Sequence, residues 1–328
     1  MLHTETMFSR HALITARLLL ETLGLFALLD VLAMRVTSSD WAWLLYPPLL
    51  LAQAFTLQRI YIVGHEAAHK KLVPANRWWN DALGQVLLLP ILVPVVIYRK
   101  VHYFHHGFNR KDHQHSALDV FVSPWPVTPV VKGFFYLVWY LGIFAGGYFL
   151  HSVASIIIFL FIPTEQARKI SPAFHNWTAR DRLTAWAQFL ACVGFHALVY
   201  ALDSRLWLYA LGLPFLAFAW VWSLLVYIFH YATTIGDDVR YNVRRLERHW
   251  FFSWLLMNFN EHATHHIQPT IPWYELPEDR KDLPAAFAAK NQTTGSFLWA
   301  ILQQIKGPTV VYAKDTNPTP HLFVRWED

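Results

Sequence analysis

Three short segments of this chain are rich in histidine at helical spacing. The pattern HxxHH occurs at residues 102–106 and again at 262–266, and the related pattern HExxH occurs at 65–69. On an α-helix, positions i, i+3 and i+4 lie within about 100° of one face. Each HxxHH segment therefore turns three imidazoles toward the same side of a rigid element, which indicates a metal site.

Chance does not account for both HxxHH segments. Histidine makes up 18 of the 328 residues, so HxxHH is expected about 0.05 times in such a chain, and a pair of them about 0.001 times. HxxxH alone is expected about once by the same count, so the first cluster gains its significance from the other two. We therefore take eight residues as metal-ligand candidates: His65, His69, His102, His105, His106, His262, His265 and His266.

Composition places the chain among integral membrane proteins. It is 55% hydrophobic and only 15% charged, whereas soluble proteins carry about 25% charged residues. Its 16 Trp and 14 Tyr residues suit anchoring at a membrane–water interface. The formal charge of +5 does not indicate a nucleic-acid partner, because the basic residues are spread between apolar runs. The single cysteine, Cys192, excludes a disulfide within the chain.

The shared site restricts how the chain crosses the bilayer. If all three clusters lie on one side, the number of crossings between them is even. Residues 82–98 are too few to cross twice, because one crossing needs about 20 residues. They must dip in and return, and Pro90 and Pro94 fit a broken segment. Residues 133–162 must likewise return, bending about Gly146-Gly147.

These arguments predict an all-α integral membrane protein that forms a single domain over residues 1–328. It has about four transmembrane helices, two partial insertions that are re-entrant or interfacial, and a cytoplasmic helical cap holding the metal site. The connecting turns at 35–40 and 203–205 contain few basic residues, and most other Lys and Arg fall on the histidine side. By the positive-inside rule, we expect the active site to face the cytoplasm, in a bacterial inner membrane. The predicted spans are 18–34, 41–63, 183–202 and 206–230, with partial insertions at 82–98 and 133–162.

Eight imidazoles are too many for one metal ion, since a zinc site takes three or four ligands. We therefore predict a dinuclear site, and we favour two non-haem iron ions with O₂ as co-substrate, because imidazole suits iron and zinc is redox-inactive. One alternative remains. The segment His65-Glu66-Ala67-Ala68-His69 is also the signature of a zinc protease, in which Glu66 is the general base. In the di-iron interpretation Glu66 orients an imidazole. Asp119 and Glu261 either do the same or are solvated loop carboxylates.

The motifs HEAAH, HYFHH and HATHH, in this order and between apolar runs, resemble those of the membrane fatty acid desaturase superfamily. The resemblance covers about residues 41–280. It implies a di-iron enzyme that acts on an unactivated C–H bond of a fatty acyl chain, with electrons from a separate ferredoxin- or cytochrome-like carrier. A fatty acid desaturase is the favoured activity. Substrate position decides the reaction, so a lipid or carotenoid hydroxylase or ketolase, or a fatty acid decarboxylase forming a terminal alkene, remains open.

The resemblance also implies a ninth ligand. A histidine at the end of the last span often completes the site in that family, and His230 matches that place. It would complete one iron at five nitrogens and leave the other with four. His113 and His115 are either supports of the site or solvated loop residues. Five basic residues are candidates for binding a carboxylate or phosphate head group or for interfacial anchoring: Arg99, Lys100, Arg240, Arg244 and Arg245.

Overall fold

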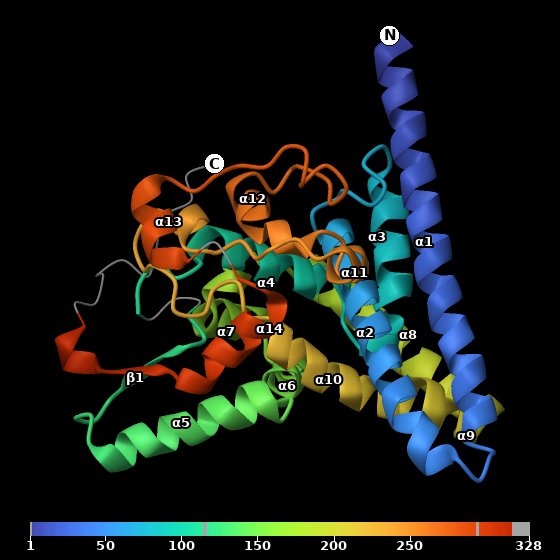
Figure 1. The fold of residues 1–328 in the computed structure, drawn as a ribbon, viewed down its shortest axis with the longest axis horizontal. Coiled ribbons are helices and arrows are strands. Elements are labelled where there is room, and N and C mark those ends of the chain that lie inside the picture. Colours follow the sequence, from blue (N-terminus) through green and yellow to red (C-terminus); the bar gives the residue numbers. More distant parts are fainter. Residues whose placement is uncertain (1, 114–116, 293–294, 317–328) are drawn as a thin grey trace.

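The computed structural model describes residues 2–113, 117–292 and 295–316, and the chain is mostly helical there. Two antiparallel helical hairpins organise the fold, and the first of them stands at the right in Figure 1. In the first, α1 (Leu2–Val36) runs down and α2 (Ala42–Ala68) returns. In the second, α8 (Ala179–Leu202) is followed by α9 (Ser204–Leu206), a π-helical stretch (Trp207–Gly212) and α10 (Leu213–Leu225).

The described residues contain three helices that are long and apolar enough to span a membrane: Arg10–Val36, Ala179–Leu202 and Ser204–Leu225. Helix α2 holds the predicted span 41–63 and is 27 residues long, but it is not one of the three. Its middle carries four buried polar side chains, which reduce its apolar character: Gln53, Thr56, Gln58 and Arg59. Four complete crossings therefore remain a prediction.

The predicted span 206–230 is too long at its C-terminal end. Helix α10 ends at Leu225, and residues 226–232 form successive turns. The backbone N–H of His230 donates to the carbonyl of Tyr227, three residues earlier, instead of continuing the α-helical pattern. His230 therefore lies in a turn beyond the helix, where tertiary contacts set its orientation.

Both predicted partial insertions are bent helix pairs. Helix α3 (Arg77–Leu88) continues through a 3₁₀ turn (Leu89–Ile91) and meets α4 (Val95–Phe108) at 94°. Helices α5 (Pro129–Phe144) and α6 (Gly147–Phe161) meet at 87°. The first break contains the two predicted prolines, and the second contains Gly146 with φ 78°. The bends lie where the sequence predicts them, and their entry into a bilayer remains a prediction.

The sequence predicts an all-α protein, but the structure also contains two short strands. Two four-residue strands, β1 (Val120–Ser123) and β2 (Thr309–Tyr312), pair in parallel, with Val120 opposite Thr309. Both are rich in valine and aromatic residues, which favour strands, but four residues are too few to reveal a strand in the sequence. The pairing anchors the C-terminal segment against α5 (Figure 1).

Short helices and 3₁₀ turns make up much of the remaining chain. Helix α12 lies next to α4 (Figure 1). The short α-helices are α7 (Thr164–Ile170), α11 (Trp250–Leu255), α12 (His262–Ile267), α13 (Ala285–Asn291) and α14 (Phe297–Gln303). The 3₁₀ turns are Pro172–Phe174, Val239–Tyr241, Phe259–Glu261, Gln304–Lys306 and Ala313–Asp315.

The two hairpins meet at both ends of α2. Its C-terminal half packs on α10 through a buried apolar cluster that includes Leu57, Ile60 and Val63. At the opposite end, the side chain of Arg205, in the turn of the second hairpin, donates to the carbonyl of Met34 and the hydroxyl of Thr37, each at 2.9 Å. The turns at 35–40 and 203–205 therefore lie together, about 40 Å along α2 from the first histidine cluster at 1.5 Å per residue.

Candidate metal centre

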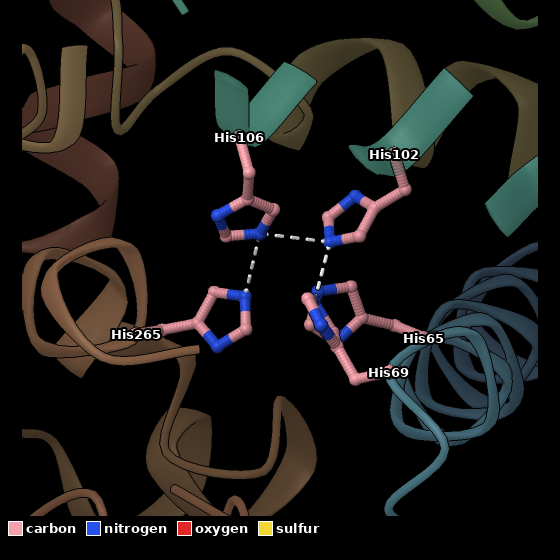
Figure 2. A group of neighbouring side chains, drawn as sticks. All are labelled: His65, His69, His102, His106 and His265. Atoms are coloured by element: carbon pink, nitrogen blue, oxygen red, sulfur yellow. Dashed lines mark hydrogen bonds between the residues drawn. The ribbon is translucent and has the colours of Figure 1, made fainter. Parts of the chain in front are cut away.

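The structure brings nine histidines from distant segments into two adjacent groups. In each group, one nitrogen of every imidazole lies within 4.8 Å of one nitrogen of every other. Figure 2 shows the rings of the first group pointing toward one another from α2, α4 and α12. The five-histidine group consists of His65, His69, His102, His106 and His265. The four-histidine group consists of His105, His230, His262 and His266.

Each HxxHH segment contributes histidines to both groups. Helix α4 directs His102 and His106 into the five-histidine group and His105 into the four-histidine group. Helix α12 divides its histidines in the opposite sense, with His265 alone in the five-histidine group. Positions i and i+4 are about 40° apart around a helix, whereas i+3 lies about 60° to the other side of i. That angular difference lets one short helix contribute to two neighbouring centres.

His230 lies in the four-histidine group, which differs from the sequence-based expectation. The expected division into five and four nitrogens matches the two groups, but His230 does not supply the fifth nitrogen. His265 fills that place, because α12 turns it away from its two neighbours and toward α2. Loss of His230 would therefore leave five and three imidazoles rather than four and four.

The Nε2 atoms face one another at short distances. In the five-histidine group, His102 Nε2 lies 2.7 Å from His69 Nε2 and 3.0 Å from His106 Nε2. In the four-histidine group, His230 Nε2 lies 3.1 Å from His262 Nε2. A neutral imidazole has one donor and one acceptor nitrogen, so converging Nε2 atoms cannot all be satisfied by hydrogen bonds. A metal ion about 2.1 Å from each nitrogen accounts for separations of about 3 Å.

Burial keeps these imidazoles in the ligand form. Burial first, and then the neighbouring imidazoles, lowers the pKa of His262, His265 and His266 well below the ordinary value. These side chains are neutral at pH 7, as metal ligation requires. Neither ring nitrogen of the buried His65 has a hydrogen-bond partner. An unpaired buried nitrogen costs about 1–3 kcal/mol, so the donor set fits a bound metal.

A backbone carbonyl orients His230. Its Nδ1 lies 3.2 Å from the carbonyl oxygen of Asn242, and because a carbonyl only accepts, Nδ1 must carry the proton. Nε2 then has its lone pair free toward the group. The Asn242 side chain holds that segment by donating to the carbonyls of Arg110 and Gly236, at 3.0 and 2.9 Å. Asn242 has no signal in the sequence, because it is a single amide in a polar loop.

The three carboxylates proposed to orient ligands differ in their contacts. Glu66 is buried, and its Oε1 lies 3.6 Å from His65 Nδ1. Glu261 instead pairs with Arg245, whose Nε lies 2.8 Å from Glu261 Oε2.

Asp119 pairs with the buried Arg110 and accepts from the backbone N–H of Ala232 at 2.8 Å. Among the contacts described, Asp119 and Glu261 therefore brace the segments beside His230 and α12, and Glu66 alone approaches an imidazole.

Most of the basic residues proposed for a head group are engaged within the protein. Arg99 Nη1 donates to Asp81 at 3.1 Å, and the same guanidinium donates to the carbonyls of Ala67 and Ala68. Arg245 pairs with Asp282 as well as with Glu261. These contacts hold loops together, and head-group binding or interfacial anchoring by these side chains stays a prediction.

The remaining candidates have different surroundings. Lys100 donates to the carbonyl of Asn176 at 3.2 Å, and Arg240 stacks on the ring of Tyr241. Arg244 is buried and lies over the ring of Trp299. Of the two loop histidines, His113 is exposed and belongs to neither histidine group, and His115 lies outside the described residues.

Comparison with known proteins identifies similar sequences over most of the chain. Residues 41–297 match the family described as fatty acid desaturase. An sn-1 acyl-lipid omega-3 desaturase (ferredoxin) of Nostoc sp. is 24% identical over 260 residues, covering 77% of this chain and 59% of the relative. An sn-1 oleoyl-lipid 12-desaturase of Synechocystis sp. is 24% identical over 310 residues, covering 82% and 77%.

A plant protein is similar to the same extent. A chloroplastic omega-6 fatty acid desaturase of Brassica napus is 25% identical over 296 residues, covering 85% of this chain and 62% of the relative. The matched region thus spans about three fifths of the Nostoc and Brassica relatives.

Proposed function

The chain belongs to the fatty acid desaturase family, a family of oxidoreductase enzymes, and from this premise we propose that it is an O₂-dependent di-iron enzyme that introduces a double bond into a fatty acyl chain. The observation that carries the proposal is the convergence of nine imidazoles in two adjacent groups. Two redox-active ions need two sets of neutral nitrogen ligands, and the groups offer five and four.

Each histidine group would hold one iron ion. His65, His69, His102, His106 and His265 would bind the first, and His105, His230, His262 and His266 the second. When bound, the irons supply O₂-dependent removal of hydrogen from an unactivated C–H bond with two electrons from a carrier. The chain itself supplies the ligand geometry and the neutral state of the imidazoles.

Aromatic side chains shield the histidines from water. The ring centroid of Phe259 lies 5.1 Å from that of His65 and 4.7 Å from that of His262, so it covers both groups at their junction. Phe229 lies 4.6 Å from His262. These rings restrict rotation of the imidazoles and keep water away from the nitrogens, which strengthens each ligand interaction.

Desaturation is favoured over the other oxidations by the relatives, whose names specify acyl-lipid desaturases. Hydroxylation or ketolation of a lipid or carotenoid, and decarboxylation to a terminal alkene, would use the same donor set, and no contact in the described residues favours them. A zinc protease is disfavoured, because His65 and His69 share their group with three further imidazoles from α4 and α12. Such a protease needs two histidines and one further ligand.

A substrate, an electron donor and a membrane location belong to the proposed activity. The substrate would be the acyl chain of a lipid, and the electron donor a separate ferredoxin-like carrier, since the name of the Nostoc relative specifies ferredoxin. We propose that the chain forms one domain in a bacterial inner membrane and that the histidine groups face the cytoplasm, on the side opposite the joined turns.

Product and metal analysis test this function together. The full chain would be produced in a bacterial host with a ferredoxin and its reductase, and lipid acyl chains would be examined by mass spectrometry. For the wild-type chain, we expect acyl chains that have lost two hydrogens and about two irons per chain. The His262→Ala variant should form no such product and should bind fewer than two irons. An added oxygen atom would instead identify a hydroxylase. One zinc per chain without iron would overturn the di-iron proposal.

A further inference from the structure

We propose that a small cavity beside His230, with Arg244 as its floor and two lysines at its rim, is a binding site for an oxyanion, namely a phosphate or carboxylate group. The cavity has a volume of about 110 Å³ and is lined by Tyr231, Ala232, Arg244, Lys290, Gln292, Gln303 and Lys306. A cavity needs about 10–15 Å³ to admit one water, so this one accommodates several waters or an oxyanion such as phosphate.

The floor of this cavity is a buried cation, Arg244, which has no ion-pair partner among the described residues. Arg244 is 3% exposed, donates through Nη2 to the carbonyl of Tyr231 and lies over the ring of Trp299 at 5.3 Å. Its Nε has no hydrogen-bond partner, and no carboxylate forms an ion pair with it within the described residues. Burial lowers the pKa of Arg244 to about 10, so the guanidinium remains charged at neutral pH.

The rim of the cavity is formed by two lysines, which add positive charge where the cavity opens to solvent. Lys290 and Lys306 are exposed, whereas Arg244 is not, so a ligand approaching from solvent meets the lysines first. Lys306 Nζ donates to Gln303 Oε1 at 2.6 Å, which holds this lysine beside the cavity. The lining contains three cations and no Asp or Glu.

A nearby acid does not neutralise Arg244. Asp119 is close enough to favour the charged form of Arg244, but this carboxylate is already paired with Arg110, which repels Arg244. A buried charge without a partner is strongly destabilising. An oxyanion in the cavity would remove this cost by accepting from the guanidinium and the lysines in charge-assisted hydrogen bonds.

Two sources offer this chemistry: a free anion such as phosphate, or the head group of an anionic lipid. Tyr231, which lines the cavity, follows His230 directly, so a bound head group would lie next to the four-histidine group. The inference rests on the contacts of Arg244 and is independent of the metal assignment.

The test uses variants at the rim, because Arg244 contacts the residue next to His230 and its replacement could disturb the fold. The variants are the double change Lys290→Gln/Lys306→Gln and, as a matched control, Lys169→Gln at an exposed lysine of α7. Purified, metal-loaded full-length protein in neutral detergent would be titrated with inorganic phosphate at constant ionic strength, with thermal unfolding and calorimetry as readouts.

Phosphatidylglycerol is the second probe, with bound lipid counted by native mass spectrometry against phosphatidylcholine. For at least one probe, we expect the double variant to bind about 100-fold more weakly than the wild-type chain. Each lysine would contribute about tenfold in affinity, or 1.4 kcal/mol. The affinity of the Lys169→Gln variant should equal that of the wild-type chain. Binding of phosphate supports a free-anion site, and binding of phosphatidylglycerol alone supports a head-group site. Equal affinity of all three proteins for each probe, or no binding at all, would overturn the proposal.

Discussion

Four fully buried asparagines, Asn80, Asn109, Asn242 and Asn291, tie together the segments around the histidine groups. Asn80 donates to the carbonyl of Ala67, near the end of α2. Asn109 and Asn291 donate to backbone carbonyls of the 241–243 segment. Amides suit this role because they satisfy several backbone groups without adding charge. At the residue scale, these contacts hold together the backbone segments that carry or neighbour the imidazoles.

His230 is expected to be essential for one of the two metal positions. His230→Ala reduces the four-histidine group to three imidazoles and leaves the five-histidine group complete. We expect between one and two irons per chain and at least a 100-fold loss of activity, measured by metal analysis and product formation. His230→Gln would show the same loss. Two irons and near-native turnover in the Gln variant would remove His230 from the ligand set.

Asn242 is expected to act on His230 through the backbone. Asn242→Ala removes donors to the carbonyls of Arg110 and Gly236. The Arg110 carbonyl keeps the N–H of Gly236 as a donor, whereas the Gly236 carbonyl loses the donor described here. One acceptor left unpaired costs about 1–3 kcal/mol, so we expect the free energy of unfolding to fall by about that amount. Iron should be lost selectively, to fewer than two per chain, because the carbonyl that accepts from His230 shifts.

The control for this variant is Asn76→Ala, which removes the N-cap of α3. It should cost about 1 kcal/mol with both irons retained. Full iron content in Asn242→Ala would show that Asn242 does not position the ligand.

At the scale of elements, both bent helix pairs depend on backbone conformations unsuited to a straight helix. Pro94 precedes α4 and Leu92 adopts φ 59° between the first pair. Gly146 adopts φ 78° between α5 and α6, and a Cβ there would lie 3.2 Å from the backbone nitrogen of Trp220. Each bend directs the following helix across α10 or α2 instead of away from them.

Gly146→Ala is therefore expected to destabilise the protein. A side chain in the left-handed region costs about 1–2 kcal/mol, and the contact with Trp220 adds to this, so we expect a loss of about 1–3 kcal/mol in thermal or denaturant unfolding. Gly133→Ala in α5 is the matched control, since its Cβ would meet nothing within 4 Å. It should be neutral or stabilise by up to about 1 kcal/mol. Equal effects of the two changes would contradict this account of the bend.

At the scale of the whole molecule, the joined turns and the histidine groups lie at opposite ends of α2. Arg205 links the turns of the two hairpins, while His65 and His69 end the same helix on the other side. If the hairpins cross the bilayer, the two ends face different compartments.

Cysteine labelling is expected to place these ends on opposite sides. In a Cys192→Ala background, reagents that do not cross the membrane should label Ser38→Cys only from outside and His113→Cys only from the cytoplasm. Lys169→Cys, in the exposed part of α7, should behave like His113→Cys. Labelling of positions 38 and 113 from the same side would exclude this topology.

The sequence by itself determined the histidine clusters and the places where helices bend. Spacing at i, i+3 and i+4 is a local property of one helix, so the residues of both HxxHH segments could be read without any tertiary contact. The φ restriction of Pro90 and Pro94 and the freedom of Gly146 are also local.

Only the tertiary structure decided how these residues are used. The division of each HxxHH segment between two groups depends on how α4, α12 and α2 face one another. The role of Asn242, the pairing of β1 with β2 and the stacking of Arg244 on Trp299 arise from contacts between distant segments. No pattern within a short stretch encodes such contacts, because packing determines which partner a buried polar group finds.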